Sequence, residues 1–189
     1  MTVAIRPASP GDAGAIARVR VASWRATYRG IVPDAYLDAM QEAPSAAMWE
    51  RVLSAGADAA TVVVATDADE VVGFAASNRL PEPKRGLDSE LTAAYVLPAW
   101  QRAGIGRRLV HDAVHAQRGL GASAMIAWVI AKNRGARAFL ERLSGELVVE
   151  QPFEWDGIEL VEAGYAFRDL DAVVARCNDW PAAAPGTLH

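Results

Sequence analysis

The sequence predicts one α/β domain whose central sheet mixes parallel and antiparallel strands and carries helices on both faces. The length of 189 residues suits a single domain, since domains commonly have roughly 100–200 residues. The apolar spacing is helical early in the chain and strand-like afterwards. Later, strand-length runs alternate with helical patterns, which favours a parallel crossover. We assign residues 1–176 to the domain and residues 177–189 to a C-terminal tail.

The first part of the domain is predicted to be one short strand followed by helices. Ile16, Val19 and Ser23 recur at helical spacing, and Gly30 then ends the first helix. The predicted elements are strand Val3–Arg6, helix Asp12–Tyr28, a short helix from Pro33 to about Met40, and a helix that starts at Pro44.

The middle of the chain reads as strands. A β-branched run, a polar turn and a second run predict a hairpin, and a proline-rich stretch after it predicts a loop. The predicted elements are strands Thr61–Thr66 and Val71–Ser77, loop Pro81–Gly86, and strand Glu90–Leu97.

The last part alternates helices and strands and closes with a hairpin at Asp156-Gly157, a strong turn signal. The predicted elements are a helix from Gly104 to about Arg118, strand Ser123–Ile130, helix Asn133–Leu143, and strands Glu146–Trp155 and Ile158–Phe167. The full order is β-α-α(-α)-β-β-β-α-β-α-β-β, with a parallel crossover between the fourth and fifth strands.

Composition excludes several classes of protein. The chain has 19 Lys and Arg against 23 Asp and Glu, and this mild acidity argues against binding to nucleic acid. Cys177 is the single cysteine, so an intrachain disulfide is impossible and a cysteine zinc site is disfavoured. The stretch Gly119–Ala131 is too short to span a bilayer. We expect a cytoplasmic protein without a membrane partner.

The segment that indicates chemistry runs from Tyr95 to Val110. A strand ends there, a loop with Gly104 and Gly106 follows, and a helix begins. Glycines let backbone N–H groups approach an anion, and a helix N-terminus adds free donors and a positive dipole end. This combination suits a pyrophosphate.

Two other phosphate loops fit less well. The P-loop signature, a glycine loop that ends in Gly-Lys-Ser/Thr, is absent. The dinucleotide fingerprint needs a small residue where Leu109 stands and an acid about 20 residues after the loop, but Ala122–Ala131 contains no acid. A nucleotide-dependent oxidoreductase therefore stays a rival interpretation that NADH binding would test.

The loop Gln101-Arg102-Ala103-Gly104-Ile105-Gly106 resembles the acyl-CoA loop of the GNAT-type N-acetyltransferases, Gln/Arg-x-x-Gly-x-Gly/Ala. The resemblance extends over about residues 3–170. Glu90–Pro98 is similar to the family's strand before the loop, and Asn133–Glu141 to its Asn-x-x-Ala-x-x-Phe-Tyr-Glu helix. Trp24–Gly30 and Val161–Tyr165 are similar to the end of its first helix and to its last strand.

The resemblance implies a fold in which the fourth and fifth strands splay apart around the pantetheine arm of CoA. It places the residues that bind acetyl-CoA on the fourth strand, in the loop and on the Asn helix. These are Ala94, Tyr95, Val96, Gln101, Arg102, Ala103, Gly104, Ile105, Gly106, Arg107, Asn133, Ala136 and Phe139. It implies no metal.

Acetyl transfer to an amine needs a base, because an ordinary alkylamine with a pKa of about 10.4 is protonated at neutral pH. The resemblance places Glu90 at the family's frequent base position. The family often has a tyrosine that protonates the departing thiolate, and here that position is Leu140. An ordinary thiol, with a pKa of about 8.5, is a tolerable leaving group, so we expect transfer without that acid.

Each of these residues also has a structural explanation. Glu90 fits a solvent-exposed strand position, and Asn133 fits a helix N-cap with or without a contact to CoA. Trp24 and Tyr28 suit either an acceptor pocket or core packing. His111 and His115 have a spacing compatible with a metal, but the sequence offers no third ligand, so we expect a solvated helix face.

The sequence therefore predicts an N-acetyltransferase that moves an acetyl group from acetyl-CoA to a primary amine by direct attack on the thioester. The acceptor is a small molecule or a peptide, and neither its identity nor the acyl chain length follows from the residues. A homodimer is compatible with the sequence. The alternative is a non-catalytic acyl-CoA-binding sensor or interaction module on the same fold.

Overall fold

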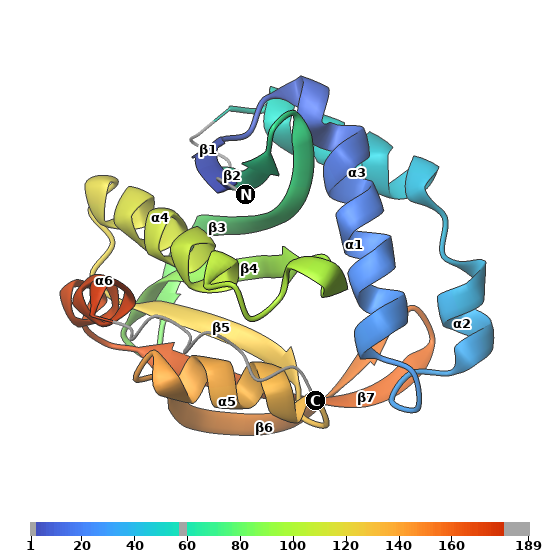
Figure 1. Ribbon diagram of the computed structural model, residues 1–189. Helices are drawn as coiled ribbons and strands as arrows, with labels where there is room; N and C mark the ends of the chain where they lie inside the picture. Colours follow the sequence, from blue (N-terminus) through green and yellow to red (C-terminus); the bar gives the residue numbers. More distant parts are fainter. Residues whose placement is uncertain (1–2, 57–59, 180–189) are drawn as a thin grey trace, which may run out of the picture.

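The computed structural model describes residues 3–56 and 60–179. Its core is a seven-stranded sheet with the strand order β1-β2-β3-β4-β5-β7-β6 (Figure 1). The strands are β1 (Val3–Pro7), β2 (Thr61–Asp67), β3 (Glu70–Lys84), β4 (Leu87–Val96), β5 (Met125–Ile130), β6 (Glu146–Trp155) and β7 (Ile158–Phe167). The helices are α1 (Ala13–Thr27), α2 (Asp34–Ala39), α3 (Glu42–Ser54), α4 (Ile105–Gly119), α5 (Arg134–Arg142) and α6 (Leu170–Asn178), with short 3-10 turns at Pro10–Asp12 and Pro98–Trp100.

Helices cover both faces of the sheet because its inner strands are apolar on both sides. Val63 and Ala65 of β2 face a core shared with α4, α5 and α6. Val62 and Val64, which alternate with them, face a second core with α1 and α3. This alternation places neighbouring side chains of a strand on opposite faces. The predicted mixed sheet with helices on both faces is confirmed.

The parallel pair of the sheet is short. β4 and β5 are paired only from Ser89 to Leu91, opposite Met125 to Ala127. Just beyond, the register against β3 shifts so that Thr92 is an extra residue in β4, which is a β-bulge. The Thr92 hydroxyl donates a 3.1 Å hydrogen bond to the Ala76 carbonyl. The predicted splay between the fourth and fifth strands is therefore present.

Several predicted bounds differ from those of the structure. The loop predicted over Pro81–Gly86 is largely strand, because β3 continues to Lys84 and β4 starts at Leu87. The helix predicted from Gly104 starts at Ile105, with Gly104 as its N-cap residue.

The structure also contains a helix that was not predicted, α6. The domain boundary proposed at residue 177 falls inside this helix, and the Cys177 side chain is 1% exposed. The remainder of the predicted tail, from Trp180, lies outside the described residues. No helix in the described ranges is long and apolar enough to cross a membrane.

Candidate active site

The loop between β4 and α4 presents backbone donors at a helix N-terminus. Gly104 has φ 78° and caps α4, while Arg102 also has a positive φ, 63°. Arg108 is the first residue of α4 whose N–H donates a hydrogen bond to a preceding carbonyl, that of Gly104 at 3.2 Å. Within residues 3–56 and 60–179, nothing accepts a hydrogen bond from the N–H groups of residues 103–107. These donors, at the positive end of the helix, form a cradle for an anion.

Gly106 brings the start of α4 close to two other predicted cofactor residues. A Cβ at Gly106 would stand 3.8 Å from Val96 Cγ2 and 3.9 Å from Phe139 Cζ. The end of β4, the loop and α5 therefore meet at this glycine. The Gln101 side chain donates a 3.0 Å hydrogen bond to the Val96 carbonyl, which ties the loop to the strand end.

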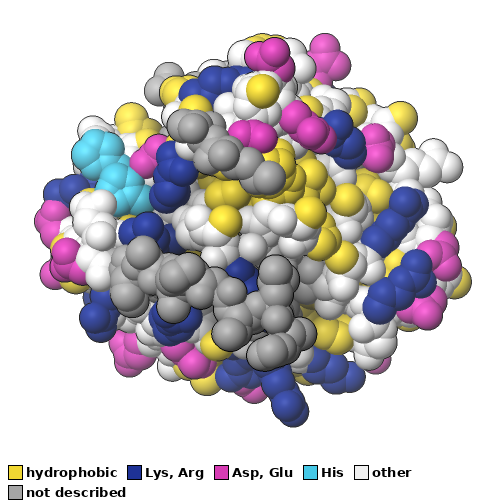
Figure 2. Space-filling view, in the orientation of Figure 1, with side chains coloured by type: hydrophobic (Ala, Val, Ile, Leu, Met, Phe, Trp, Pro, Cys, Tyr) yellow, Lys and Arg dark blue, Asp and Glu magenta, His cyan; other side chains and the backbone are white. Residues whose placement is uncertain are grey.

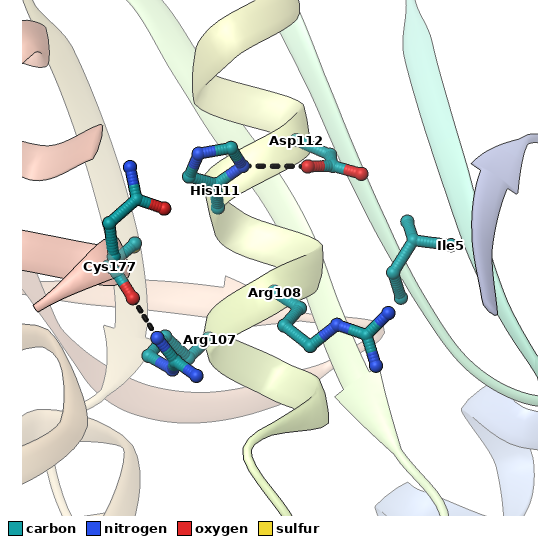
Figure 3. A pocket seen from close by; sticks show the side chains of 7 residues that line it. Ile5, Arg107, Arg108, His111, Asp112 and Cys177 are labelled. Atoms are coloured by element: carbon teal, nitrogen blue, oxygen red, sulfur yellow. Dashed lines mark hydrogen bonds and ion pairs between the residues drawn. The ribbon is translucent and has the colours of Figure 1, made fainter. Parts of the chain in front are cut away.

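Ile105 directs its side chain away from the loop, whereas the Arg107 guanidinium lies 3.7 Å from the Cβ that an alanine at Gly104 would carry. Ile105 is 2% exposed and belongs to the apolar core. The Arg107 guanidinium donates a hydrogen bond to the Cys177 carbonyl of α6. Beside it lies a cavity of about 300 Å³ lined by Arg107, Arg108, His111 and Cys177, among others (Figure 3). Ile105 can therefore offer only its backbone N–H to an anion at the loop, whereas Arg107 has both its backbone N–H and a guanidinium beside Gly104.

The C-terminal half of α1 crosses the open end of the gap between β4 and β5. The Ser23 hydroxyl donates to the Val96 carbonyl of β4 at 3.4 Å. The Trp24 indole donates to the Tyr95 hydroxyl at 3.0 Å. On the other side of the gap, the Asn133 amide donates to the Tyr28 hydroxyl at 3.4 Å. Figure 1 shows the tips of β4 and β5 both pointing toward this helix.

Asn133 caps α5 and also contacts the end of α1. Its Oδ1 accepts a 3.0 Å hydrogen bond from the Ala136 N–H, so the predicted N-cap of α5 is confirmed. Its amide nitrogen is left to contact Tyr28 at the gap. A contact between Asn133 and CoA stays a prediction.

Burial perturbs the two phenols at the gap. It raises the pKa of Tyr28 to about 12, with a further contribution from the neighbouring Tyr95. Burial also raises the pKa of Tyr95. Trp24 and Tyr28 are 5% and 7% exposed and pack in one apolar cluster, which agrees with the core-packing alternative, and their contact with an acceptor stays a prediction.

Glu90 stands on the last paired stretch before the gap. Its register partners are Asn78 of β3 and Ile126 of β5, and its side chain is half-buried. Burial raises the pKa of the Glu90 carboxyl, and the charge of Glu162 on β7 raises it further. A raised pKa is typical of carboxylates that act as general bases. Leu140, by contrast, is 5% exposed within the core and offers no polar atom.

A groove of about 690 Å³ opens between the segment after α1 and the β6–β7 hairpin. Its lining is mostly apolar, with charged side chains at Lys132, Glu154 and Glu159. The apolar residues that line it are Ile31, Pro33, Ile130, Pro152, Phe153, Ile158, Leu160 and Val161. Ile130 also packs in the same apolar cluster as Tyr28, so the groove adjoins the gap.

The hairpin tip is held over α1 by residues that sequence reasoning missed. The ring of Trp155 lies 5.4 Å from that of Trp24, and the Arg20 guanidinium lies 5.3 and 5.9 Å from the two rings. The Trp155 indole also donates to the Tyr36 hydroxyl of α2 at 2.8 Å. The Asp156-Gly157 turn located the hairpin tip in the sequence, but no local signal indicated that it folds onto α1.

The other candidate residues contribute no site. The His111 and His115 rings stack at 6.1 Å, and these histidines of α4 form the cyan patch on the surface in Figure 2. In the part of the chain that the structure describes, no three His, Cys, Asp or Glu side chains gather as metal ligands. On the face in Figure 2, basic and acidic side chains are interspersed.

The sequence model of the acetyltransferase (GNAT) family matches residues 19–145. The chain belongs to the GNAT family of acetyltransferases. It is 35% identical over 177 residues to YuaI of Bacillus subtilis strain 168, an uncharacterized N-acetyltransferase, and this match covers 93% of the chain and 99% of YuaI. Membership in this family favours the acyl-CoA interpretation of the glycine loop, which stays a prediction.

Two GNAT-fold structures show the same architecture. The PaiA N-acetyltransferase from Thermoplasma acidophilum, solved in complex with coenzyme A, has a TM-score of 0.67 and 20% identity, over 86% of this chain and 98% of that one. YncA from Salmonella typhimurium, solved with its cofactor acetyl-CoA, has a TM-score of 0.64 and 20% identity, over 89% and 94% of the two chains. At these identities the likeness shows the fold.

Proposed function

We propose that this protein transfers the acetyl group of acetyl-CoA to a primary amine by direct attack on the thioester. The observation that carries the proposal is the position of the anion cradle of residues 103–107. It lies at the end of β4, where pairing with β5 has already stopped at Leu91. A pyrophosphate at the cradle would thus place its pantetheine arm along an unpaired strand edge. Relatives of the same fold that were solved with coenzyme A or acetyl-CoA support this choice.

The residues present fit acetyl-CoA, which supplies an activated thioester when it is bound. The N–H groups of residues 103–107 hold the pyrophosphate, and the backbone of Ala94–Val96 binds the pantetheine arm. The fixed geometry of loop and strand brings the thioester to the gap in a defined orientation, which is a large part of catalysis by proximity. Asn133, Ala136 and Phe139 lie on the α5 side of the same gap.

Glu90 is the base in this proposal. An amine becomes a nucleophile only after it loses its extra proton, and a positioned base contributes roughly 10²–10⁴-fold to the rate. Burial and the charge of Glu162 raise the pKa of Glu90, which increases its affinity for that proton. The carboxyl accepts the proton directly or through one water molecule.

The acceptor enters through the groove between the segment after α1 and the β6–β7 hairpin. Its apolar lining suits the body of an amine with a hydrocarbon part. The carboxylates of Glu154 and Glu159 at the groove suit the positive charge that the amine carries in water. A small amine or the end of a peptide fits this description.

The proposal is tested by binding and by turnover. Calorimetric titration with acetyl-CoA is expected to show one saturable site, with ATP and NADH as negative controls. We expect Glu90→Gln to bind acetyl-CoA like wild type and to lose roughly 10²–10⁴-fold in the transfer rate to the best member of a panel of primary amines. Glu50→Gln, at an exposed position on α3, is the matched control and is expected to change neither quantity.

Each outcome has a separate meaning. Absence of saturable acetyl-CoA binding contradicts the proposed function itself. Full activity of Glu90→Gln contradicts only the assignment of the base. The burial of Leu140 where the family often has a tyrosine favours a second candidate, a non-catalytic acyl-CoA sensor. Acetyl-CoA binding with no transfer to any amine of the panel supports that candidate.

A further inference from the structure

Leu140 stands where the family often has a tyrosine, and its side chain cannot donate a proton. In the proposed transfer, another group must therefore stabilise the sulfur of CoA as it departs. The Leu140 side chain is part of the core beneath α4, α5 and α6. The hydroxyl groups at the open end of the gap instead come from Tyr28 at the end of α1 and Tyr95 on β4. Both belong to the apolar cluster that also contains Ile130, at the end of β5.

We propose that Tyr28 donates a hydrogen bond to the CoA thiolate as it departs. The proposal rests on the proposed acetyl transfer. Tyr28 is packed in one cluster with Tyr95 of β4 and Ile130 of β5, the strands that border the gap. Its oxygen accepts the hydrogen bond from the Asn133 amide at 3.4 Å. In the described part of the chain no group accepts the Tyr28 hydroxyl hydrogen, so that hydrogen is available to a substrate.

Tyr95 is less suited to this task. Its ring packs against Phe74 with centroids 5.5 Å apart, within the core under α1 and α3. Its oxygen is held by the Trp24 indole at 3.0 Å, on the α1 side. Tyr28, in contrast, reaches the α5 side of the gap through Asn133.

The surroundings of Tyr28 keep its hydroxyl protonated. Tyr95 faces it from β4 as a titratable group, while Trp24, Ile130 and Asn133 face it from α1, β5 and the start of α5. Burial raises the pKa of Tyr28 to about 12. The phenol therefore stays a donor between about pH 8.5, where an ordinary thiol ionises, and about pH 12.

Tyr28 keeps its proton throughout the proposed transfer. The amine, which has already given its extra proton to Glu90, attacks the thioester carbon. The C–N bond forms, and the second proton that nitrogen loses passes to solvent. The C–S bond then breaks, and its electron pair stays on sulfur. The thiolate leaves with the hydrogen bond from Tyr28 and takes a proton from solvent afterwards. Tyr28 lowers the barrier because it interacts more strongly with the anionic sulfur than with the neutral thioester.

The test compares CoA with acetyl-CoA, and it needs no acceptor. A hydrogen bond to an ionised group favours that ionised form, so the wild type is expected to bind CoA more tightly as the pH rises from 7 to 10. Hydrogen bonds to charged groups predict a gain of roughly ten- to a hundredfold over the change for acetyl-CoA, which carries no titrating thiol. Calorimetry at several pH values measures both ligands on the intact protein.

Tyr28→Phe keeps the ring and removes the hydroxyl, so it is expected to lose this pH-dependent gain and to keep its affinity for acetyl-CoA. Tyr36→Phe, whose hydroxyl bonds the Trp155 indole instead, is the matched control and is expected to behave like wild type. The proposal is overturned if Tyr28→Phe shows the wild-type response. It is also overturned, with no variant needed, if the affinity of wild type for CoA does not rise relative to acetyl-CoA. Failure of acetyl-CoA to bind at any pH contradicts the proposed function instead.

Discussion

Replacing Gly104 with alanine tests whether the loop between β4 and α4 is an anion cradle or an ordinary turn. Gly104 has φ 78°, and an added Cβ would meet nothing closer than the Arg107 guanidinium at 3.7 Å. The cost in the free protein is therefore conformational, about 1–2 kcal/mol for an L residue in the left-handed region. For a chain of this size we expect a drop of about 2–8 °C in Tm, at roughly 2–4 °C per kcal/mol.

The same substitution is also expected to weaken acetyl-CoA binding. Relaxation away from the left-handed region turns the N–H groups of residues 103–107, and the new methyl group stands beside them. We expect Kd for acetyl-CoA to rise at least tenfold, about 1.4 kcal/mol. Isothermal titration calorimetry measures Kd, and a thermal melt without ligand measures Tm.

Gly121 provides the matched control. Gly121 has φ 84° with open space around it, but it lies past the other end of the helix, so Gly121→Ala is expected to lower Tm equally and leave Kd unchanged. At Gly106 a Cβ would make only ordinary contacts, so Gly106→Ala is expected to stabilise by up to about 1 kcal/mol. A Gly104→Ala protein with the Tm of Gly121→Ala and the Kd of wild type would refute the cradle.

Other parts of the fold give further expected outcomes. The Arg6 guanidinium holds the pKa of the Asp12 carboxyl well below its usual range, so Asp12 contributes stability that is present above about pH 4 and is lost as the pH falls through the lowered pKa. Asp12→Asn should cost about 1.5–3 kcal/mol near pH 7 in urea unfolding, and this difference from wild type should shrink in acid. Asn133→Ala should cost about 0.5–2 kcal/mol through loss of the helix cap, measured in the same way, while Asn133→Asp keeps most of that stability. Gly164→Ala places a Cβ 2.8 Å from the Trp128 ring, so it should cost roughly 1–3 kcal/mol and shift the tryptophan emission.

Local patterns of apolar residues predicted most of the fold, because a helix buries every third or fourth residue and a half-buried strand buries every second one. The prediction was wrong at Pro81–Gly86, where prolines suggested a loop. The register between β3 and β4 jumps there from Arg79 opposite Ser89 to Lys84 opposite Leu87. The prolines fall in the unpaired part, where no backbone donor is needed, so an extended strand tolerates them.

The sequence of the last helix, α6, carries a helix signal in the form of an N-cap residue and a helical spacing of apolar residues. Asp169 caps it through a 3.0 Å bond from the Ala172 N–H. Leu170, Val173 and Cys177 recur at helical spacing and are all buried. The composition of the residues after this helix is typical of a tail, and the predicted start of the tail at residue 177 lies within the last turn of α6.

The candidate site was predictable where its geometry is local. The glycine loop and the Asn133 cap each depend on a few consecutive residues, and both have the expected backbone conformation. The contacts that close the site join residues far apart, such as Tyr28 with Asn133, 105 positions along the chain. A single sequence carries no periodicity that reports such pairs, so the crossing of α1 over the gap was visible only in the structure.

The β-bulge at Thr92 links the two halves of the proposed chemistry. It ends the pairing of β4 with β5 one residue after Leu91, which opens the gap for the thioester. It also fixes Glu90 on the last paired stretch, next to the place where the gap begins. α1 contacts β4 through Ser23 beyond the same bulge, so the helix end that carries Tyr28 is held against the end of β4. One irregularity in one strand thus lies between the proposed base and the gap in which the proposed hydroxyl donor would act.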